Sequence, residues 1–281
     1  MKILITGGGG FVGRNLARLL PHFGHETIAP THQELDMVDF RCYEAFLKKT
    51  NPDAIIHTAF KGHFGKQSDT EAFLDNIKMY ESLWMADEGK PTIIFGSGAE
   101  FDRRLAIDNV REQKLFESWP IDLYGLCKNI IARRFMDGFA NDSEFHNPLL
   151  LRLFGCFGAD EPDYRFIKRS ILRLKQGLPI EIVQDKYMDF IYIEDVAACV
   201  DNVLHLDEDF YRHMNLTYEK KYKLSDIAKI ICNVMKVNEN IVIKTPGLDL
   251  PYTGNGSLIA MENVDMYGLE QGIARMVFDL K

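Results

Sequence analysis

Residues 2–13 read Lys2-Ile3-Leu4-Ile5-Thr6-Gly7-Gly8-Gly9-Gly10-Phe11-Val12-Gly13. The first five form a short apolar run that predicts a buried strand, and Phe11 to Pro21 has the periodicity of a helix. Glycines at positions 7, 10 and 13 between a strand and a helix are typical of a turn that cradles the pyrophosphate of a dinucleotide. They permit the tight turn, the approach of phosphate and close helix–strand packing, while the helix N-terminus supplies N–H donors. A merely flexible loop is the alternative, and the agreement of strand, spacing and helix disfavours it.

The rest of the N-terminal half continues this alternation. We expect strands at 26–29, 54–58, 92–95 and 149–154, and helices at 41–49, 70–88 and 123–139. Near-continuous apolar strands separated by amphipathic helices predict an α/β fold, a doubly wound parallel sheet of the Rossmann type. After about residue 155 the pattern is less regular, with helices expected at 166–176, 193–206 and 224–235 and extended segments at 180–183, 189–193 and 241–244.

We therefore expect two domains. The first is a dinucleotide-binding Rossmann domain over 1–155, to which about 185–206 return. The second is a smaller C-terminal α+β substrate lobe over 156–184 and 207–281. The boundary is placed where the regular strand–helix alternation stops.

Composition excludes several classes of protein. The 281 residues carry a net charge of −8 without a block of Lys and Arg, which argues against a nucleic-acid partner. The five cysteines are far apart, and no Cys/His cluster predicts a metal site. We interpret them as reduced, packed thiols of a cytoplasmic protein. The apolar runs are too short for a signal peptide or a membrane span.

The residues after the second predicted strand bear on the choice of dinucleotide. An NAD site usually has Asp or Glu there for the ribose hydroxyls, and an NADP site has an Arg nearby. This chain has Ala29-Pro30-Thr31-His32, with neither signal. The missing acid removes repulsion against a 2′-phosphate, and His32 is a candidate contact to one. NADP(H) is therefore favoured over NAD(H), and both stay open.

A candidate catalytic pair follows from a Tyr-x-x-x-Lys spacing, which occurs at Tyr124/Lys128 and at Tyr164/Lys168. Tyr124 begins a predicted helix, so Lys128 lies on the same face one turn later. Ser97 follows the strand at 92–95 and so lies at the carboxyl edge of the sheet, where α/β sheets bind ligands. The second pair has no such partner, and we interpret it as a coincidence.

The residue types suit hydride transfer between a nicotinamide and a carbinol. The ordinary pKa of tyrosine, near 10, makes it a poor base at neutral pH. A nearby ammonium favours the phenolate of Tyr124, which makes it an acid/base. Ser97 would orient the substrate oxygen. The alternative for each residue alone is structural: a packed Tyr, a solvated Lys and a Ser in a turn.

These residues resemble one known family, the extended short-chain dehydrogenase/reductases that act on nucleotide-activated sugars. Four segments carry the resemblance in the same order along nearly the whole chain: Ile5–Gly13, Phe95-Gly96-Ser97-Gly98-Ala99-Glu100-Phe101, Tyr124-Gly125-Leu126-Cys127-Lys128, and Asp189–Val196. Thr31–Asp39 and the short chain resemble the dTDP-4-keto-rhamnose reductase and GDP-fucose synthase branches.

The resemblance implies further site residues. Gly7, Gly10, Phe11, Val12, Gly13, Thr31 and His32 would bind the cofactor, with Asp36 and Met37 at the adenine. Thr58, Ala59 and Asn76 would line the cofactor, and Phe154 would lie near the nicotinamide. Gly98, Arg165 and Lys186 are candidate substrate contacts. The resemblance also implies a homodimer formed through the helices at 70–88 and 123–139, and a role in cell-surface polysaccharide biosynthesis.

Departures from the family narrow the reaction. Gly98 and Ala99 stand where sugar 4,6-dehydratases have an acidic pair, which excludes dehydration unless Glu100 substitutes. Ala99 and Arg165 stand near the Cys and His positions of the 3,5-epimerising branch. Ketoreduction or epimerisation at C4 of a nucleotide-linked sugar remains. Gly155 and Met188 replace the family's sugar-contacting Asn and diphosphate-contacting Arg. Either Lys186, Arg165 or Arg169 supplies that charge, or these three cations are solvated surface residues.

Two rival functions remain at this stage. One is an oxidoreductase for a non-sugar carbonyl, and the other is a non-catalytic NAD(P)-sensing protein. Intact Ser97, Tyr124 and Lys128 argue against the second, and the sugar-branch resemblance argues against the first.

Overall fold

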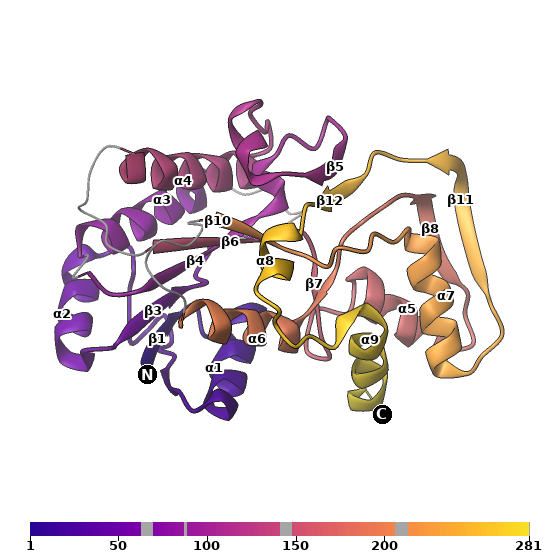
Figure 1. Cartoon of the computed structure of the whole chain (residues 1–281), viewed down its shortest axis with the longest axis horizontal. Coiled ribbons are helices and arrows are strands. Elements are labelled where there is room, and N and C mark those ends of the chain that lie inside the picture. The colour runs from indigo at the N-terminus through magenta and orange to yellow at the C-terminus, as the bar shows by residue number, and fades with distance from the viewer. Residues whose placement is uncertain (63–69, 87–88, 141–147, 206–212, 281) are drawn as a thin grey trace. The chain divides into compact units, whose positions relative to one another are not determined.

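The structure is a computed structural model, which describes residues 1–62, 70–86, 89–140, 148–205 and 213–280 (Figure 1). Its main sheet contains six strands: β1 (Lys2–Thr6), β2 (Glu26–Ile28), β3 (Ala54–His57), β4 (Thr92–Ser97), β6 (Pro148–Leu153) and β10 (His213–Leu216). Their order across the sheet is β10-β6-β4-β3-β1-β2. This is the parallel α/β sheet that the sequence predicts.

The register brings the carboxyl ends of the central strands together. β1 pairs in parallel with both β2 and β3, and Thr6 is level with His57. β3 pairs in parallel with β4. The chain moves from β1 to β2 on one side and then returns to β3 on the other. A change of direction of this kind is where doubly wound sheets bind ligands.

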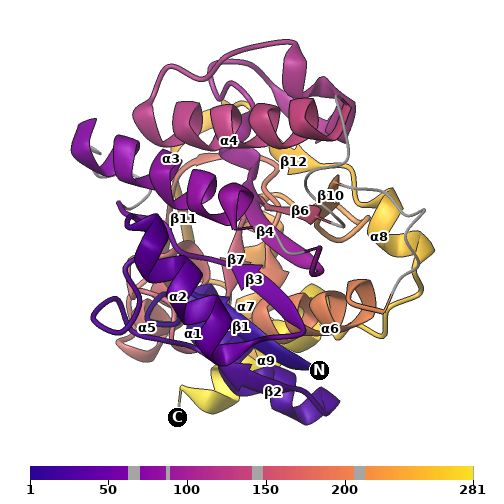
Figure 2. The same ribbon diagram turned by 90° about the vertical axis from the view of Figure 1, so that its left-hand side faces the viewer.

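Four helices accompany this sheet: α1 (Phe11–Leu19), α2 (Phe40–Thr50), α3 (Thr70–Met85) and α4 (Leu123–Ala140). α3 contacts both α2 and α4, and Figure 1 shows α3 and α4 on one face of the sheet with α1 on the other. Figure 2 shows α3 and α4 side by side from another direction. Every residue of β3 and β4 is buried, as expected for strands covered on both faces.

The described chain divides into two compact units. The first contains Met1–Arg104, Glu112–Arg152 and Asp201–Met214, and the second contains Leu105–Arg111, Leu153–Val200 and Asn215–Lys281. The chain therefore rejoins the first unit at Asp201, later than the position near residue 185 that the sequence suggests. The reason is local, because β9 (Ile191–Tyr192) pairs with β7 (Cys156–Phe157) inside the second unit.

The second unit has small sheets and helices. β8 (Ile180–Asp185) pairs with β11 (Ile241–Leu248), and β12 (Tyr252–Gly254) pairs with β5 (Ile107–Val110). Its helices are α5 (Phe166–Lys175), α7 (Leu224–Met235), α8 (Ser257–Met261) and α9 (Gly268–Asp279), and α6 (Ile193–Val203) belongs to it as far as Val200. α7 packs against α5 and α9.

Several predicted bounds need correction. The first helix ends at Leu19 rather than Pro21, and a 3-10 turn, η1 (Leu20–Phe23), follows because Pro21 has no N–H to continue the α-helical ladder. The strand predicted at 241–244 extends to Leu248. The helix predicted to residue 206 ends at Val203, and the helix predicted at 70–88 ends at Met85; residues 87 and 88 lie outside the described residues. β5, β7, β10, β12, α8 and α9 were not predicted.

Two statements concern the described residues only. No helix among them is both long enough and apolar enough to cross a membrane. The five cysteines are thiols, four of them buried and Cys42 partly buried, which agrees with the predicted packing role.

Candidate active site

The glycine turn has the shape that close approach of phosphate requires. Gly7 has φ +76°, a conformation that L side chains rarely adopt. A Cβ on Gly13 would lie 2.4 Å from the Gly7 carbonyl oxygen, so only glycine fits there. The Gly10 N–H donates to Gly7 O over 2.9 Å and closes the turn. No side chain caps α1 at Gly10, so the amides at its N-terminus, from Phe11 and Val12, are available for the phosphates.

The loop after β3 lies directly against this turn. A Cβ on Gly7 would come within 2.6 Å of the Ala59 amide nitrogen. The Thr58 hydroxyl donates to Thr6 O over 2.7 Å, which ties the ends of β1 and β3 together. Asn76 of α3 is buried and binds the backbone of Lys61 twice, accepting from its N–H at 2.7 Å and donating to its carbonyl at 2.9 Å. Asn76 therefore fixes this loop.

The segment after β2 is held by its own side chains. The Glu34 carboxylate accepts from both the N–H and the hydroxyl of Thr31, at 2.7 and 2.9 Å. These bonds lower the pKa of Glu34. His32 is exposed, Met37 is buried, and Asp36 accepts from the Val38 N–H. The segment after β2 thus carries a carboxylate at Glu34, just beyond the Ala29-Pro30-Thr31-His32 motif.

Ser97 is the last residue of β4 and begins a short 3-10 turn, η2 (Gly98–Glu100). Its hydroxyl oxygen accepts from the Ala99 N–H at 3.1 Å, and its own N–H donates to Glu100 Oε1 at 2.8 Å. This reciprocal pair is a capping box. Because the hydroxyl acts as acceptor in that bond, its proton is directed elsewhere and suits donation to a substrate oxygen.

Tyr124 and Lys128 lie one turn apart at the start of α4 and share a neighbour. Lys128 Nζ donates to the Phe95 carbonyl over 2.8 Å, two residues before Ser97. The same nitrogen lies 4.5 Å from the centre of the Phe60 ring. Phe60 meets the Tyr124 ring edge-on, with centroids 5.1 Å apart and an angle of 73°. One aromatic ring therefore contacts both members of the predicted pair.

Phe60 also links this pair to the glycine turn, because it follows Ala59 in the β3 loop. A Cβ on Gly125 would lie 2.6 Å from Ala99 O, so α4 begins hard against the Ser97 turn. Tyr124, Lys128 and the glycine turn thus all contact one loop, residues 58–61, and Ser97 lies two residues after Phe95, whose carbonyl binds Lys128. All four belong to the first unit.

The surroundings of Lys128 are unusual for a lysine. Burial lowers its pKa, and the carboxylate of Glu100 and the thiol of Cys127 oppose that change. Burial also lowers the pKa of His57 to about 3, with the Lys128 charge as a second cause. His57 Nδ1 lies 2.8 Å from the Thr6 hydroxyl. Burial raises the pKa of Cys127 to about 11. His57 and Cys127 are therefore neutral near pH 7.

The candidate substrate residues Arg165 and Lys186 lie in the second unit. Arg165 Nε is 3.5 Å from Glu161 Oε2, and Lys186 Nζ is 3.6 Å from Asp249 Oδ2. Phe154 is buried in the same unit against Tyr252. A Cβ on Gly155 would lie 2.6 Å from Asp189 O, which explains why the family's Asn is absent there. Nothing in these contacts assigns either cation a ligand.

The two side chains of the second Tyr-x-x-x-Lys spacing, Tyr164 and Lys168, have different surroundings. Tyr164 is 60% exposed, whereas Lys168 donates to Glu161 O and pairs with Asp163.

The sequence did not identify three residues that contact the candidate site: Phe60, Glu100 and Arg152. Of these, Glu100 was considered only for its position in sugar dehydratases. Glu100 stands three residues after Ser97, which is a capping-box spacing visible in the sequence. Among the described residues, no cluster of His, Cys, Asp and Glu is arranged to hold a metal ion.

Glu100 cannot serve as an elimination acid. Its side chain is fully buried, with one oxygen on the Ser97 N–H and the other on Arg152. Ala99, at the position of the 3,5-epimerising Cys, is buried and carries no group that moves a proton. The site therefore offers Ser97, Tyr124 and Lys128 for acid–base work.

A parallel sheet of this order, with an uncapped helix after a glycine turn at its carboxyl edge, defines the class of Rossmann dinucleotide-binding proteins. Within that class, residues 3–217 match the NAD dependent epimerase/dehydratase family, and the chain belongs to this family of NAD(P)-dependent enzymes. The glycine turn, in which a Cβ at position 7 or 13 would clash, fits such a dinucleotide.

Individual relatives are distant but extend over the chain. GDP-L-colitose synthase of Yersinia pseudotuberculosis is 25% identical over 298 residues, which is 98% of this chain and 96% of that protein. GDP-6-deoxy-D-talose 4-dehydrogenase of Aggregatibacter actinomycetemcomitans is 24% identical, over 85% of this chain and 83% of its own. Among solved structures, GDP-mannoheptose C4 reductase from Campylobacter jejuni with NADP bound has a TM-score of 0.80 at 19% identity, over 99% of this chain and 97% of that one. This likeness confirms the fold.

Proposed function

We propose that the protein is an NAD(P)H-dependent 4-ketoreductase of a GDP-linked sugar. The observation that carries the proposal is the fixing of Lys128 by Phe95 O and the Phe60 ring beside Tyr124, next to the glycine turn. The named relatives above act on GDP-linked sugars, which supports guanine as the base. Epimerisation at C4 needs the same three side chains and is the second candidate.

In this proposal the chain's own residues handle the proton. The nicotinamide supplies or accepts the hydride when bound. The Ser97 hydroxyl donates a hydrogen bond to the C4 oxygen and holds it near Tyr124. Tyr124 gives its phenolic proton to that oxygen during reduction, and the ammonium of Lys128 stabilises the phenolate that remains. The Phe95 carbonyl keeps the ammonium in place.

The residues after β2 decide whether the site prefers NADP(H) or NAD(H) in this proposal. We propose NADP(H), with exposed His32 as the contact to the 2′-phosphate. Glu34, whose carboxylate is turned back onto Thr31, works against that preference. Binding of NADP⁺ and NAD⁺, measured by calorimetry on the purified chain, tests this assignment directly.

We also infer a homodimer formed through α3 and α4, in the cytoplasm, serving cell-surface polysaccharide synthesis. Support for the dimer comes from Leu74 and Met85 on α3, which are 51% and 63% exposed. Met79, Leu83 and Phe135 are buried within the single chain and belong to its core. A monomer by sedimentation equilibrium would contradict the dimer.

The experiment that tests the function is a screen of GDP-, UDP-, CDP- and dTDP-linked 4-keto sugars with NADPH and NADH. We expect turnover with a GDP sugar and loss of turnover, with cofactor binding retained, in Tyr124→Phe. Cofactor that copurifies and does not exchange would favour the epimerase. No binding of any nucleotide diphosphate would favour a non-sugar carbonyl substrate, and an unchanged cellular role for Tyr124→Phe would favour an NAD(P) sensor.

A further inference from the structure

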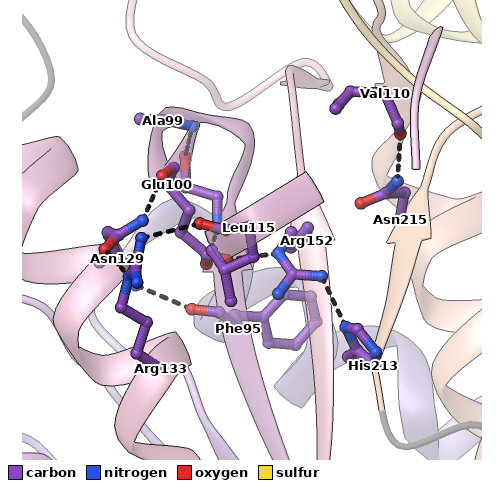
Figure 3. Close-up of polar contacts among 12 residues, drawn as sticks. Phe95, Ala99, Glu100, Val110, Leu115, Asn129, Arg133, Arg152, His213 and Asn215 are labelled. Carbon is purple, nitrogen blue, oxygen red and sulfur yellow. Dashed lines mark hydrogen bonds and ion pairs between the residues drawn. The ribbon is translucent and has the colours of Figure 1, made fainter. Parts of the chain in front are cut away.

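A fully buried ion pair lies behind the Ser97 turn. Glu100 of η2 and Arg152 of β6 are each 0% exposed, and the Arg152 Nε donates to Glu100 Oε2. Arg152 Nη1 lies 3.3 Å from His213 Nδ1 on β10, so the guanidinium spans two strands (Figure 3). Burial and the Arg152 charge lower the pKa of His213 to about 4, so this imidazole is neutral near pH 7.

The sequence around this pair is shaped to admit it. A Cβ on Gly96 would lie 2.3 Å from Glu100 Oε1 and 3.2 Å from Arg152 Cγ. Glycine at position 96 thus leaves space for the Glu100 carboxylate, which binds the Ser97 N–H. The Glu100 carbonyl in turn accepts from Asn129 Nδ2 at 2.7 Å, and Asn129 is the residue after Lys128 (Figure 3). The pair therefore contacts both elements that carry the catalytic candidates.

Stability alone is a poor reason for such a pair. Two buried charges lose their hydration, and replacing such pairs with apolar residues is often neutral or stabilising. Here Arg152 Nη2 is buried without a hydrogen-bond partner among the described residues, which adds to the cost. A costly polar group beside a reactive site points to a role in that site.

We propose that Glu100, held by Arg152, is a positioning residue of the active site, which orients the Ser97 turn and compensates the charge of the partly buried Lys128 ammonium. The orientation follows from its bond to the Ser97 N–H, reciprocal to the Ser97 cap on Ala99. This inference deepens the proposed function and rests on it for the roles of Ser97 and Lys128.

The positions and charges around Lys128 support the second half of the proposal. Lys128 Nζ donates to the Phe95 carbonyl and Glu100 Oε1 accepts from the Ser97 N–H, so the ammonium and the carboxylate bind backbone groups two residues apart on β4. The titratable neighbours that act with it are Cys127 on its own helix, His57 on β3 and Glu100 on η2. The thiol and the imidazole are neutral near pH 7, as described above. Glu100 is therefore the anion that offsets the desolvation of the ammonium, and Arg152 keeps that anion fixed in the interior.

The test measures the titration of Lys128 without substrate. Lysine ¹³Cε/¹⁵Nζ NMR on the whole chain follows each ammonium with pH, and Lys128→Arg identifies the Lys128 signal. We expect Glu100→Gln, which keeps an acceptor for the Ser97 N–H, to lower the Lys128 midpoint by at least about one pH unit. Glu161→Gln removes another buried carboxyl, one that contacts Arg165, and should leave the midpoint in place.

Glu100→Gln leaves Arg152 without its anion and risks unfolding, so a second variant is needed. Glu100→Gln/Arg152→Met removes both charges, a change that buried pairs tolerate. The Lys128 midpoint should fall in this variant as well, because Glu100 rather than Arg152 is the charge that supports it. An unchanged midpoint in the folded double variant would overturn the proposal.

Kinetics separate this inference from the proposed function. With the substrate found by the screen, the acid limb of the oxidation profile should move to higher pH in both Glu100 variants, because the phenolate of Tyr124 loses its supporting charge. If the Lys128 titration midpoint falls in the Glu100 variants but the parent chain reduces no carbonyl substrate, only the proposed function would be overturned. Turnover with an unshifted Lys128 would overturn the positioning role alone.

Discussion

The Lys128 ammonium lies 4.5 Å from the centre of the Phe60 ring, and the edge of that ring meets Tyr124. Phe60 belongs to the loop whose preceding residue, Ala59, packs against Gly7. Phe60 thus contacts the candidate acid/base pair from the same loop that packs against the cofactor turn. Its face attracts the ammonium, and its bulk keeps water from one side of it.

Replacing Phe60 by Leu should lower kcat by about tenfold, which corresponds to about 1.4 kcal/mol. Leucine fills similar space but has no aromatic face for the Lys128 ammonium, so the phenolate of Tyr124 is less well supported. Steady-state kinetics with calorimetric cofactor binding provide the check. Phe60→Tyr keeps the ring and is the matched control. Equal activity of the Leu and Tyr variants would show that the ring–ammonium contact is unimportant.

The glycine turn gives a second prediction. Gly13→Ala should abolish measurable cofactor binding, because its Cβ would lie 2.4 Å from Gly7 O and force the turn open. Gly9→Ala is the control within the same run, since a Cβ there meets nothing within 4 Å. We expect Gly9→Ala to bind cofactor as the parent does. Fluorescence titration measures the cofactor affinity of both variants. Retained binding in Gly13→Ala would contradict the requirement for glycine at position 13.

The fold of the N-terminal half could be predicted because local signals agree there. Lys2–Thr6 is apolar and bounded by glycine, and the strand is found at these residues. The helix at Leu123–Ala140 begins where Tyr124 predicts it. β5 and β12 could not be predicted in this way. They have four and three residues and pair across a long stretch of chain, and their sequences carry no periodicity of their own.

The residues of the candidate site also fall into those that local sequence signals predict and those that they do not. Motif spacing found Ser97, Tyr124 and Lys128, because a strand end and a helical turn fix where such residues lie. Phe60 and Arg152 act through tertiary contacts with residues more than 50 positions away, and no spacing connects them. A buried arginine in the apolar run Leu149-Leu150-Leu151-Arg152-Leu153 was nevertheless a visible signal. Lysine and arginine are almost never fully buried unless they are paired.

The third prediction concerns cofactor choice. Glu34→Gln should raise the affinity for NADP⁺ relative to NAD⁺ by about two- to fivefold, because an exposed carboxylate beside the 2′-phosphate site is removed while an acceptor for Thr31 stays. Glu26→Gln at the opposite end of β2 is the control and should leave the ratio unchanged. Dissociation constants at two ionic strengths provide the measurement. A gain that survives high salt would contradict the electrostatic reason.

The last prediction follows from Glu161, a buried carboxyl in the second unit. Burial raises its pKa to about 8, and Arg165 opposes that change without cancelling it. A carboxyl that stays protonated in the folded chain and ionises in the unfolded chain contributes stability below about pH 4.5, and this contribution is lost as pH rises to about 8. The free energy of unfolding of the parent should therefore fall relative to Glu161→Gln over this range, by at most about 1.4 kcal/mol per pH unit. Urea unfolding at several pH values measures it, with exposed Glu239→Gln as the control. Parallel stability curves would mean that Arg165 keeps Glu161 ionised, and Arg165 would then be engaged by that carboxylate rather than available to a diphosphate.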